Sequence, residues 1–167
     1  MKKTVNFLGI FIILTLFVAC ADKNAFVKFN MQEDQELGAA NLQSSKIKML
    51  DNVEGIVSVV YLNKVYPKVY TNDEYFYVYL YLKEKKEMFD PKKLDDIKLT
   101  MKLNSKLPIK IKKLDAKNKF SHLTLAENDW TLYYLVAFKQ DTNDKISLVL
   151  ETDQSRSDVL VYQKDEE

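Results

Sequence analysis

Apolar and polar residues alternate along most of the chain after residue 46, and this alternation predicts β-strands. The segments 97–103 (IKLTMKL) and 107–114 (LPIKIKKL) place aliphatic side chains on one face and mainly lysines on the other. A period of two is typical of strands that bury one face and leave the other in water. The lysines of the two polar faces are Lys98, Lys102, Lys110 and Lys112.

Further apolar segments of strand length predict the rest of the domain: 56–62, 75–82, 120–125, 130–138, 145–151 and 158–164. Short strands separated by turn residues favour a sandwich or a barrel. The pattern Asp129-x-Thr131-x-Tyr133 resembles the tyrosine corner of immunoglobulin-like sandwiches, although the paired cysteines of that family are missing. We therefore predict an all-β fold, an immunoglobulin-like antiparallel β-sandwich, with a small β-barrel as the alternative.

Both faces of the segment 75–82 (YFYVYLYL) carry large side chains, which predicts a central strand. The aliphatic face belongs in the core. The opposite face carries Tyr75, Tyr77, Tyr79 and Tyr81. These tyrosines either pack against another layer and their cross-strand neighbours, which is the favoured interpretation, or form an exposed platform for a partner.

The first residues predict export. Lys2 and Lys3 precede an apolar run over 5–19, which is the order of a secretory signal peptide. The run is shorter than the roughly 20 apolar residues that a membrane-spanning helix needs. We therefore predict a signal peptide rather than a signal anchor.

The end of this signal, LFVAC, resembles the lipobox of bacterial lipoproteins, which signal peptidase II cleaves before an acylated cysteine. Val18, Ala19 and Cys20 match the pattern, whereas Phe17 replaces the preferred leucine. The resemblance implies that Cys20 carries two or three acyl chains, such as palmitate. Several chains give stable membrane anchoring, so the membrane itself is a predicted partner.

Cys20 is the only cysteine of the chain, which excludes an internal disulfide and leaves a lone thiol that acylation would use. An alternative is an A-x-A-like site, Ala19-Cys20-Ala21, at which an ordinary signal peptidase would release a soluble periplasmic protein starting at Asp22. If signal peptidase II cleaves before Cys20, the chain divides into a signal peptide at 1–19, a lipidated tether with a short helix at 20–45, and an all-β domain at 46–167.

Charge and composition narrow the choice of partners. Hydrophobic residues make up 47% and charged residues 29%, as in a globular protein. The chain has 25 basic and 24 acidic residues, whereas nucleic-acid-binding proteins usually have a strong basic excess, so we predict no nucleic acid. We predict that 97–103 and 107–114 are neighbouring strands, so that their four lysines form a basic stripe. This stripe either contacts lipid phosphates, an anionic glycan or an acidic partner, or is a solvated face that discourages aggregation, which we favour.

Residues suited to catalysis or metal binding are few. His122 is the only histidine, and the adjacent Ser121 would point to the opposite face of a strand. A zinc site needs several histidine or cysteine ligands. The segment 141–144 (DTND) lacks the glycine and distal glutamate of an EF-hand and is better explained by a hairpin turn. We therefore predict no cofactor, no metal and no enzymatic activity.

These observations together predict a lipid-anchored, non-enzymatic binding or assembly module of the bacterial cell envelope, with an envelope protein as its partner. Ala21, which follows the cysteine, resembles the outer-membrane sorting pattern of some Gram-negative bacteria. The domain either contacts envelope proteins from the periplasmic side or faces outward toward host or environmental ligands.

Overall fold

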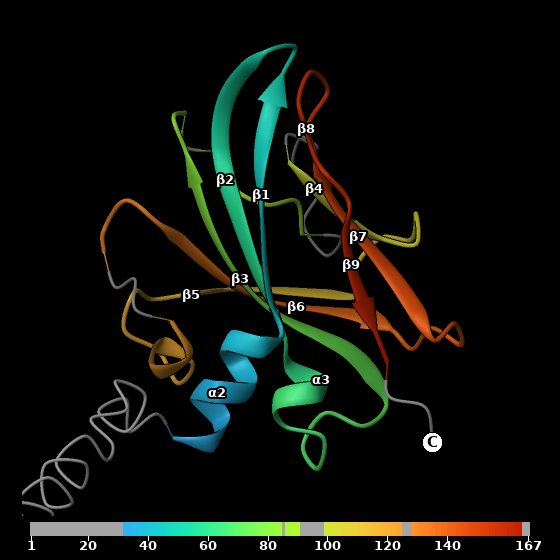
Figure 1. Cartoon of the computed structure of the whole chain (residues 1–167). Coiled ribbons are helices and arrows are strands. Elements are labelled where there is room, and N and C mark those ends of the chain that lie inside the picture. Colours follow the sequence, from blue (N-terminus) through green and yellow to red (C-terminus); the bar gives the residue numbers. More distant parts are fainter. Residues whose placement is uncertain (1–31, 85, 91–98, 125–127, 165–167) are drawn as a thin grey trace, which may run out of the picture. The chain divides into compact units, whose positions relative to one another are not determined.

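Nine antiparallel strands form one sheet in the described part of the computed structural model, residues 32–84, 86–90, 99–124 and 128–164 (Figure 1). The strands follow the order β4-β7-β8-β1-β2-β3-β6-β5, and β9 also pairs with β7. They are β1 Leu42–Met49, β2 Asn52–Tyr61, β3 Asp73–Leu82, β4 Thr100–Leu103, β5 Lys110–Leu114, β6 Leu132–Lys139, β7 Lys145–Glu151, β8 Arg156–Ser157 and β9 Leu160–Gln163. The helices are α2 Glu33–Ala40, α3 Leu62–Val65 and the 3-10 helix η3 Ser121–Leu123.

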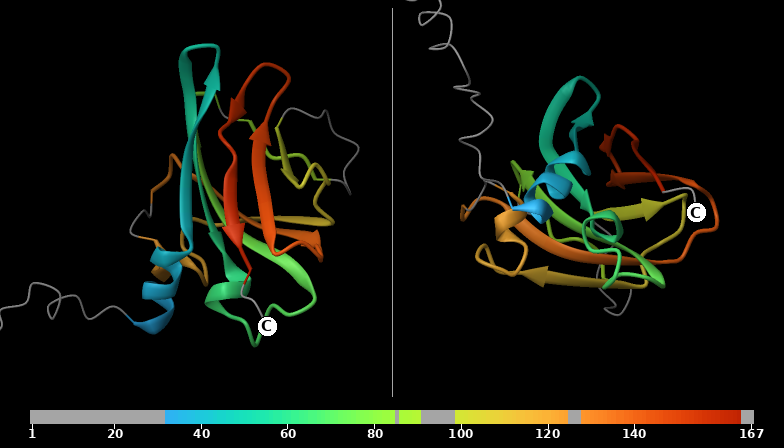
Figure 2. Two further views of the ribbon diagram at one scale, coloured as in Figure 1. Left: turned by 45° about the vertical axis from the view of Figure 1, so that its right-hand side comes forward. Right: turned by 60° about the horizontal axis from the view of Figure 1, so that its bottom comes forward.

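The sheet curls into a half-barrel (Figure 2), so the mostly β, antiparallel class is confirmed and the two-sheet sandwich is wrong. Antiparallel ladders connect β1 through β2 and β3 to β6, with Val57 opposite Leu80 and Val78 opposite Tyr134, and only the β1–β2 ladder shifts its register, between Ile47 and Lys48. A closed barrel is not formed either, because β4 and β5 lie at the two ends of the strand order. Alternation along a strand reveals the buried face, but two facing sheets and one curled sheet produce the same alternation.

The inner face of the curl holds the main hydrophobic core. Phe76 of β3 stacks on Tyr61 of β2 with ring centroids 5.1 Å apart, and the ring of Tyr162 from β9 lies 5.7 Å from each. The Tyr162 hydroxyl donates a 2.8 Å hydrogen bond to the carbonyl of Val59. Because β9 pairs with β7 and not with β2 or β3, these contacts result from the curl, which brings both halves of the sheet around one core.

Short helices cover part of the outer face and form a second cluster. Its buried members are Val60, Leu62, Val65, Tyr77, Phe120, Leu123 and Tyr133. The ring of Tyr77 lies 5.2 Å from that of Phe120, just before η3. A Cβ atom at Gly38 of α2 would lie 3.2 Å from Leu123 Cδ2, so α2 approaches η3 closely. The helices α2 and α3 therefore lie together at one end of the half-barrel (Figure 1).

The described chain shows how two predicted segments are built. The compact unit Gln32–Glu167 includes α2 and all of β1, and β1 runs from Leu42 to Met49 across residue 46, where the all-β domain was predicted to begin. The short helix predicted in the segment 20–45 is confirmed as α2. The described part of the predicted strand 120–125, residues 120–124, is not a strand: the Asn118 side chain accepts the Phe120 N–H at 2.9 Å and starts the turn that leads into η3.

The export signal, the lipobox and Cys20 lie outside the described residues. Within the described residues, no helix is long and apolar enough to cross a bilayer.

Candidate functional site

A cavity of about 540 Å³ opens at the helical end of the domain, between α2 and the loop that follows α3. Its apolar walls are Leu37, Val65, Pro67 and Val69. Its polar lining residues are Gln32, Glu33, Asp34, Tyr66 and Lys68. Apolar walls with a few polar groups are the usual composition of ligand sites, so this cavity is the first candidate for a binding site.

Three polar side chains, which we call the Asp34–Tyr66–His122 triangle, meet beside this cavity. His122 Nε2 lies 2.8 Å from Asp34 Oδ2 and 2.9 Å from the Tyr66 hydroxyl, and that hydroxyl lies 3.2 Å from Asp34 Oδ2. Asp34 is in the first turn of α2, Tyr66 follows the last residue of α3, and His122 belongs to η3. The Gln35 side-chain amide donates a 3.1 Å hydrogen bond to the carbonyl of His122, which also holds α2 against η3.

The triangle sets the charge of two of its members. Burial alone would raise the pKa of Asp34, but hydrogen bonds from His122 and Tyr66 outweigh it and lower that pKa. Asp34 is therefore a carboxylate at neutral pH. Burial and the neighbouring Asp34 charge raise the pKa of Tyr66 to about 12, so its hydroxyl stays protonated and donates to the carboxylate.

This arrangement differs from a nucleophilic triad. In a triad, one ring nitrogen of the histidine contacts the nucleophile and the other contacts the carboxylate. Here Asp34 and Tyr66 both contact Nε2, so the ring relays no proton between them. Ser121 donates instead to the carbonyl of Ala116 at 3.1 Å. Neither Tyr66 nor Ser121 is therefore activated by His122 as a nucleophile.

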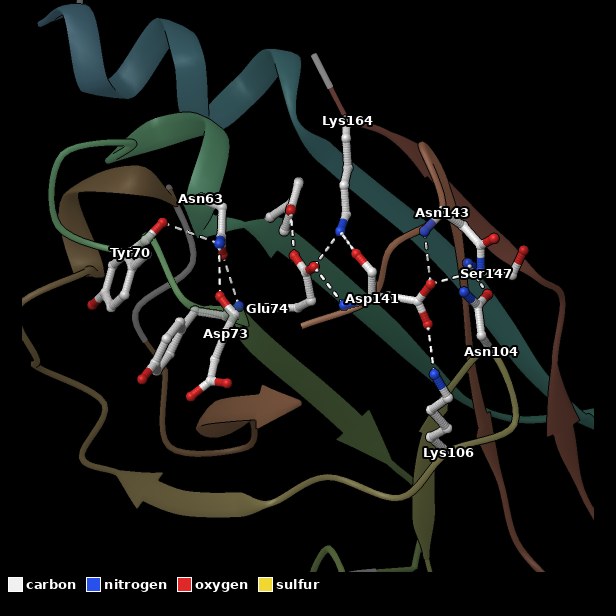
Figure 3. A network of polar contacts seen from close by, with 12 residues as sticks. Asn63, Tyr70, Asp73, Glu74, Asn104, Lys106, Asp141, Asn143, Ser147 and Lys164 are labelled. Carbon is white, nitrogen blue, oxygen red and sulfur yellow. Dashed lines mark hydrogen bonds and ion pairs between the residues drawn. The ribbon is translucent and has the colours of Figure 1, made fainter. Parts of the chain in front are cut away.

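A second polar cluster surrounds the carboxylate of Glu74, which is 2% exposed (Figure 3). Glu74 Oε2 accepts a 2.5 Å hydrogen bond from the Tyr61 hydroxyl, and Oε1 accepts the backbone N–H of Asp141 at 3.1 Å. The Lys164 ammonium donates to Glu74 Oε1 and to the carbonyl of Asp141. The ion pair compensates the buried charge and ties the residue after β9 to β3 and to the β6–β7 connection.

The side chain of Asp141 extends this cluster toward the β4–β5 turn. Its carboxylate accepts the N–H of Asn143 at 3.0 Å and a 3.1 Å hydrogen bond from the Lys106 ammonium. These interactions, with the Asn143 N–H as the strongest, outweigh burial and hold the pKa of Asp141 well below its usual range. The segment 141–144 connects β6 to β7, but the predicted hairpin is wrong, because β6 and β7 do not pair with each other.

A small pocket of about 190 Å³ lies over Glu74 and Lys164 and is also lined by Asn63 and Asp73. The Asn63 amide donates to the carbonyls of Tyr70 and Asp73, at 3.1 and 2.7 Å, and its oxygen accepts the N–H of the residue at position 75 at 2.8 Å. Glu74, Lys164 and Asn63 are thus already bonded within the domain. We therefore assign this cluster to stabilisation of the fold rather than to binding.

The tyrosines of β3 that lie nearest the helical end are packed. Tyr77 is fully buried, and its ring stacks 6.4 Å from that of Tyr133 on the neighbouring strand. The ring of Tyr75 lies 4.5 Å from that of Tyr70 in the loop after α3. For these two tyrosines the geometry agrees with the favoured packing interpretation.

The other end of the same face is open to solvent. Tyr79 is half-buried, and its burial raises the pKa of its hydroxyl. Tyr81 is 46% exposed and lies directly opposite Ile56 of β2, which is 45% exposed. Of the four tyrosines in the predicted platform, Tyr79 and Tyr81 are therefore the ones accessible at this end of the face, and their use by a partner stays a prediction.

The predicted basic stripe is divided between the two ends of the sheet. Lys102 of β4 pairs with Glu151 of β7 at 2.5 Å, whereas Lys110 and Lys112 are exposed on β5, which pairs with β6. The prediction that the two strands are neighbours is wrong, because the short 104–109 connection joins opposite edges rather than a hairpin. Lys98 lies outside the described residues.

The tyrosine-corner pattern is present locally in a different fold. The Tyr133 hydroxyl accepts the backbone N–H of Asn128 at 3.2 Å, five positions upstream. Sequence reasoning missed Asp34, Tyr66 and Glu74. Asp34 lies 88 positions from His122, and Glu74 lies 90 positions from Lys164. No local pattern signals such contacts.

Comparisons with protein-family models, curated proteins and solved structures found no match for this chain. The function is therefore argued from the residues and geometry described above.

Proposed function

We propose that this chain is a bacterial lipoprotein that holds a non-enzymatic binding or assembly module in the cell envelope. The observation that carries the proposal is the lone cysteine, Cys20, placed directly after Val18 and Ala19 at the end of an export signal. Acylation would give this thiol a function and would anchor the protein stably. An envelope protein is the expected partner, and no cofactor is required.

The short connection between anchor and domain supports a role close to the membrane. The compact unit begins at Gln32, which is twelve residues after Cys20. Twelve extended residues span at most about 40 Å. The first turn of α2 would therefore stay within that distance of the bilayer, so a partner of the helical end would also lie near the membrane.

The cavity between α2 and the loop after α3 is the proposed binding site for this partner. It combines walls such as Leu37 and Val69 with the charged groups Asp34 and Lys68. Val69 is 68% exposed, which leaves apolar surface at the cavity for a partner's side chain to cover. The exposed pair Ile56 and Tyr81 offers a second contact surface on the outer face.

The first test is the intact mass of the mature protein extracted with detergent from native membranes. The proposal expects a chain that begins at Cys20 and carries acyl chains, and a Cys20→Ser variant that is not acylated. A bare chain beginning at Asp22 would contradict it and establish a soluble periplasmic product. If the chain is acylated, protease treatment of intact cells would decide which side of the predicted outer membrane it faces. Protection supports a periplasmic role, and cleavage supports an outward-facing one.

A further inference from the structure

The Asp34–Tyr66–His122 triangle brings one nitrogen and two oxygen donors to one point on the surface of the domain. We propose that these three side chains bind a transition-metal ion such as Zn²⁺ or Cu²⁺. The site lies wholly within the compact unit, so the proposal does not depend on acylation of Cys20.

The spacing of the three donor atoms matches one face of a metal coordination shell. The three separations are 2.8, 2.9 and 3.2 Å. Two adjacent ligands, each about 2.1 Å from the ion, lie about 3.0 Å apart in an octahedral shell and about 3.4 Å apart in the tetrahedral shell usual for Zn²⁺, so Zn²⁺ would spread the three atoms by a few tenths of an ångström. An ion above the triangle would therefore contact all three atoms without a large movement of the backbone.

Hydrogen bonds alone leave one side of the triangle without a proton. Tyr66 supplies one hydroxyl proton and His122 supplies at most one proton on Nε2, while the Asp34 carboxylate supplies none. At most two protons thus serve three close contacts, and only one if the ring carries its proton on Nδ1. A bound metal ion would displace these shared protons to solvent, leave Tyr66 as a phenolate, and accept one lone pair from each of the three atoms.

The chemistry of the donors favours a transition metal over Ca²⁺ or Mg²⁺, because imidazole suits Zn, Cu, Fe and Ni. Among the described residues, no group of three or more histidine, cysteine, aspartate and glutamate side chains gathers as a metal site. The third ligand here is a tyrosine. Glu33 lines the same cavity and adds negative charge, which Lys68 opposes. The cavity leaves room for water or a partner's side chain to complete the coordination.

A bound ion would join three separate elements. Its ligands come from α2, from the residue after α3 and from η3. Metal binding should therefore hold α2, the element that follows the tether, against the rest of the domain and raise the thermal stability of the protein.

The test is calorimetric titration of the metal-free, full mature chain with Zn²⁺. We expect one ion per chain, and at least tenfold weaker binding for each of Asp34→Asn, Tyr66→Phe and His122→Gln. Glu36→Gln is the matched control, because it removes a carboxylate from the same first turn of α2 outside the triangle. Thermal unfolding of each metal-free variant checks that it folds.

A second readout does not rely on affinity. Cu²⁺ bound to the Tyr66 oxygen should produce a visible phenolate-to-metal charge-transfer band that is absent in Tyr66→Phe. No Zn²⁺ binding up to millimolar concentration would overturn the proposal. Binding that is equally strong in the wild type and in all three folded ligand variants would also overturn it.

Discussion

The Tyr61 hydroxyl donates a 2.5 Å hydrogen bond to the carboxylate of Glu74, deep in the domain. The same carboxylate is paired with Lys164, whose side chain is 20% exposed. A carboxylate in this position needs its partners, because an uncompensated buried charge is far more costly than a compensated one. The cluster therefore holds the chain after β9 to the start of β3.

Lys164→Met should lower the free energy of unfolding by about 3 kcal/mol, because it leaves the Glu74 charge without its cation. The double variant Glu74→Gln/Lys164→Met should recover part of this loss, because no charge is then buried. Urea denaturation measures both, with the exposed Lys145→Met as control. A single variant as stable as the control would show that the ion pair does not stabilise the fold.

Asp141 should make the domain sensitive to acid. Its pKa is lowered in the folded protein, so its contribution to stability is fully present above the unfolded-state pKa of about 3.9. That contribution is lost as the pH falls below about 4 toward the folded pKa. Asp141→Asn should therefore be less stable at pH 7, and its stability should change less between pH 5 and pH 2. Parallel pH dependences of the two proteins, measured by chemical denaturation, would refute this role.

Tyr77 and Tyr81 are a matched pair on one face of β3 and should respond differently to substitution. Tyr77→Ser should lower the free energy of unfolding by about 3–5 kcal/mol, because it empties a packed site. Tyr81→Ser, at an exposed position, should cost less than about 1 kcal/mol. If Tyr81 contacts an envelope partner, Tyr81→Ser should also reduce recovery of that partner after crosslinking in cells. Equal losses of stability would contradict the division of the face.

The glycines at positions 55 and 38 provide a test of packing. A Cβ atom at Gly55 would lie 2.3 Å from the carbonyl oxygen of Tyr81, so backbone must move, and Gly55→Ala should destabilise the fold by about 1–3 kcal/mol. At Gly38 the nearest atom belongs to the flexible Leu123 side chain, and alanine favours helix by up to about 1 kcal/mol. Gly38→Ala should therefore be close to neutral in the same denaturation assay. The reverse order would show that these contacts do not decide the outcome.

The sequence by itself determined which faces of the strands are apolar and where many of the strands run. The alternation in 75–82 led correctly to β3, because side-chain period is a local property of an extended backbone. For 107–114 the prediction holds only in part: β5 covers Lys110–Leu114, and Leu107 and Ile109, expected on the buried face, are 47% and 44% exposed. It also showed the lone Cys20 and its lipobox-like context, on which the proposed anchoring rests.

Only the tertiary structure decided how the strands are joined and which polar groups meet. Alternation carries no information about strand neighbours, so β4 and β5, predicted side by side, belong to opposite edges of one curled sheet. Likewise the His122 ring contacts Asp34 and Tyr66, both distant in the sequence, only because α2, α3 and η3 pack together over the outer face. Contacts between residues 56 or 88 positions apart depend on the path of the whole chain, and no local pattern encodes that path.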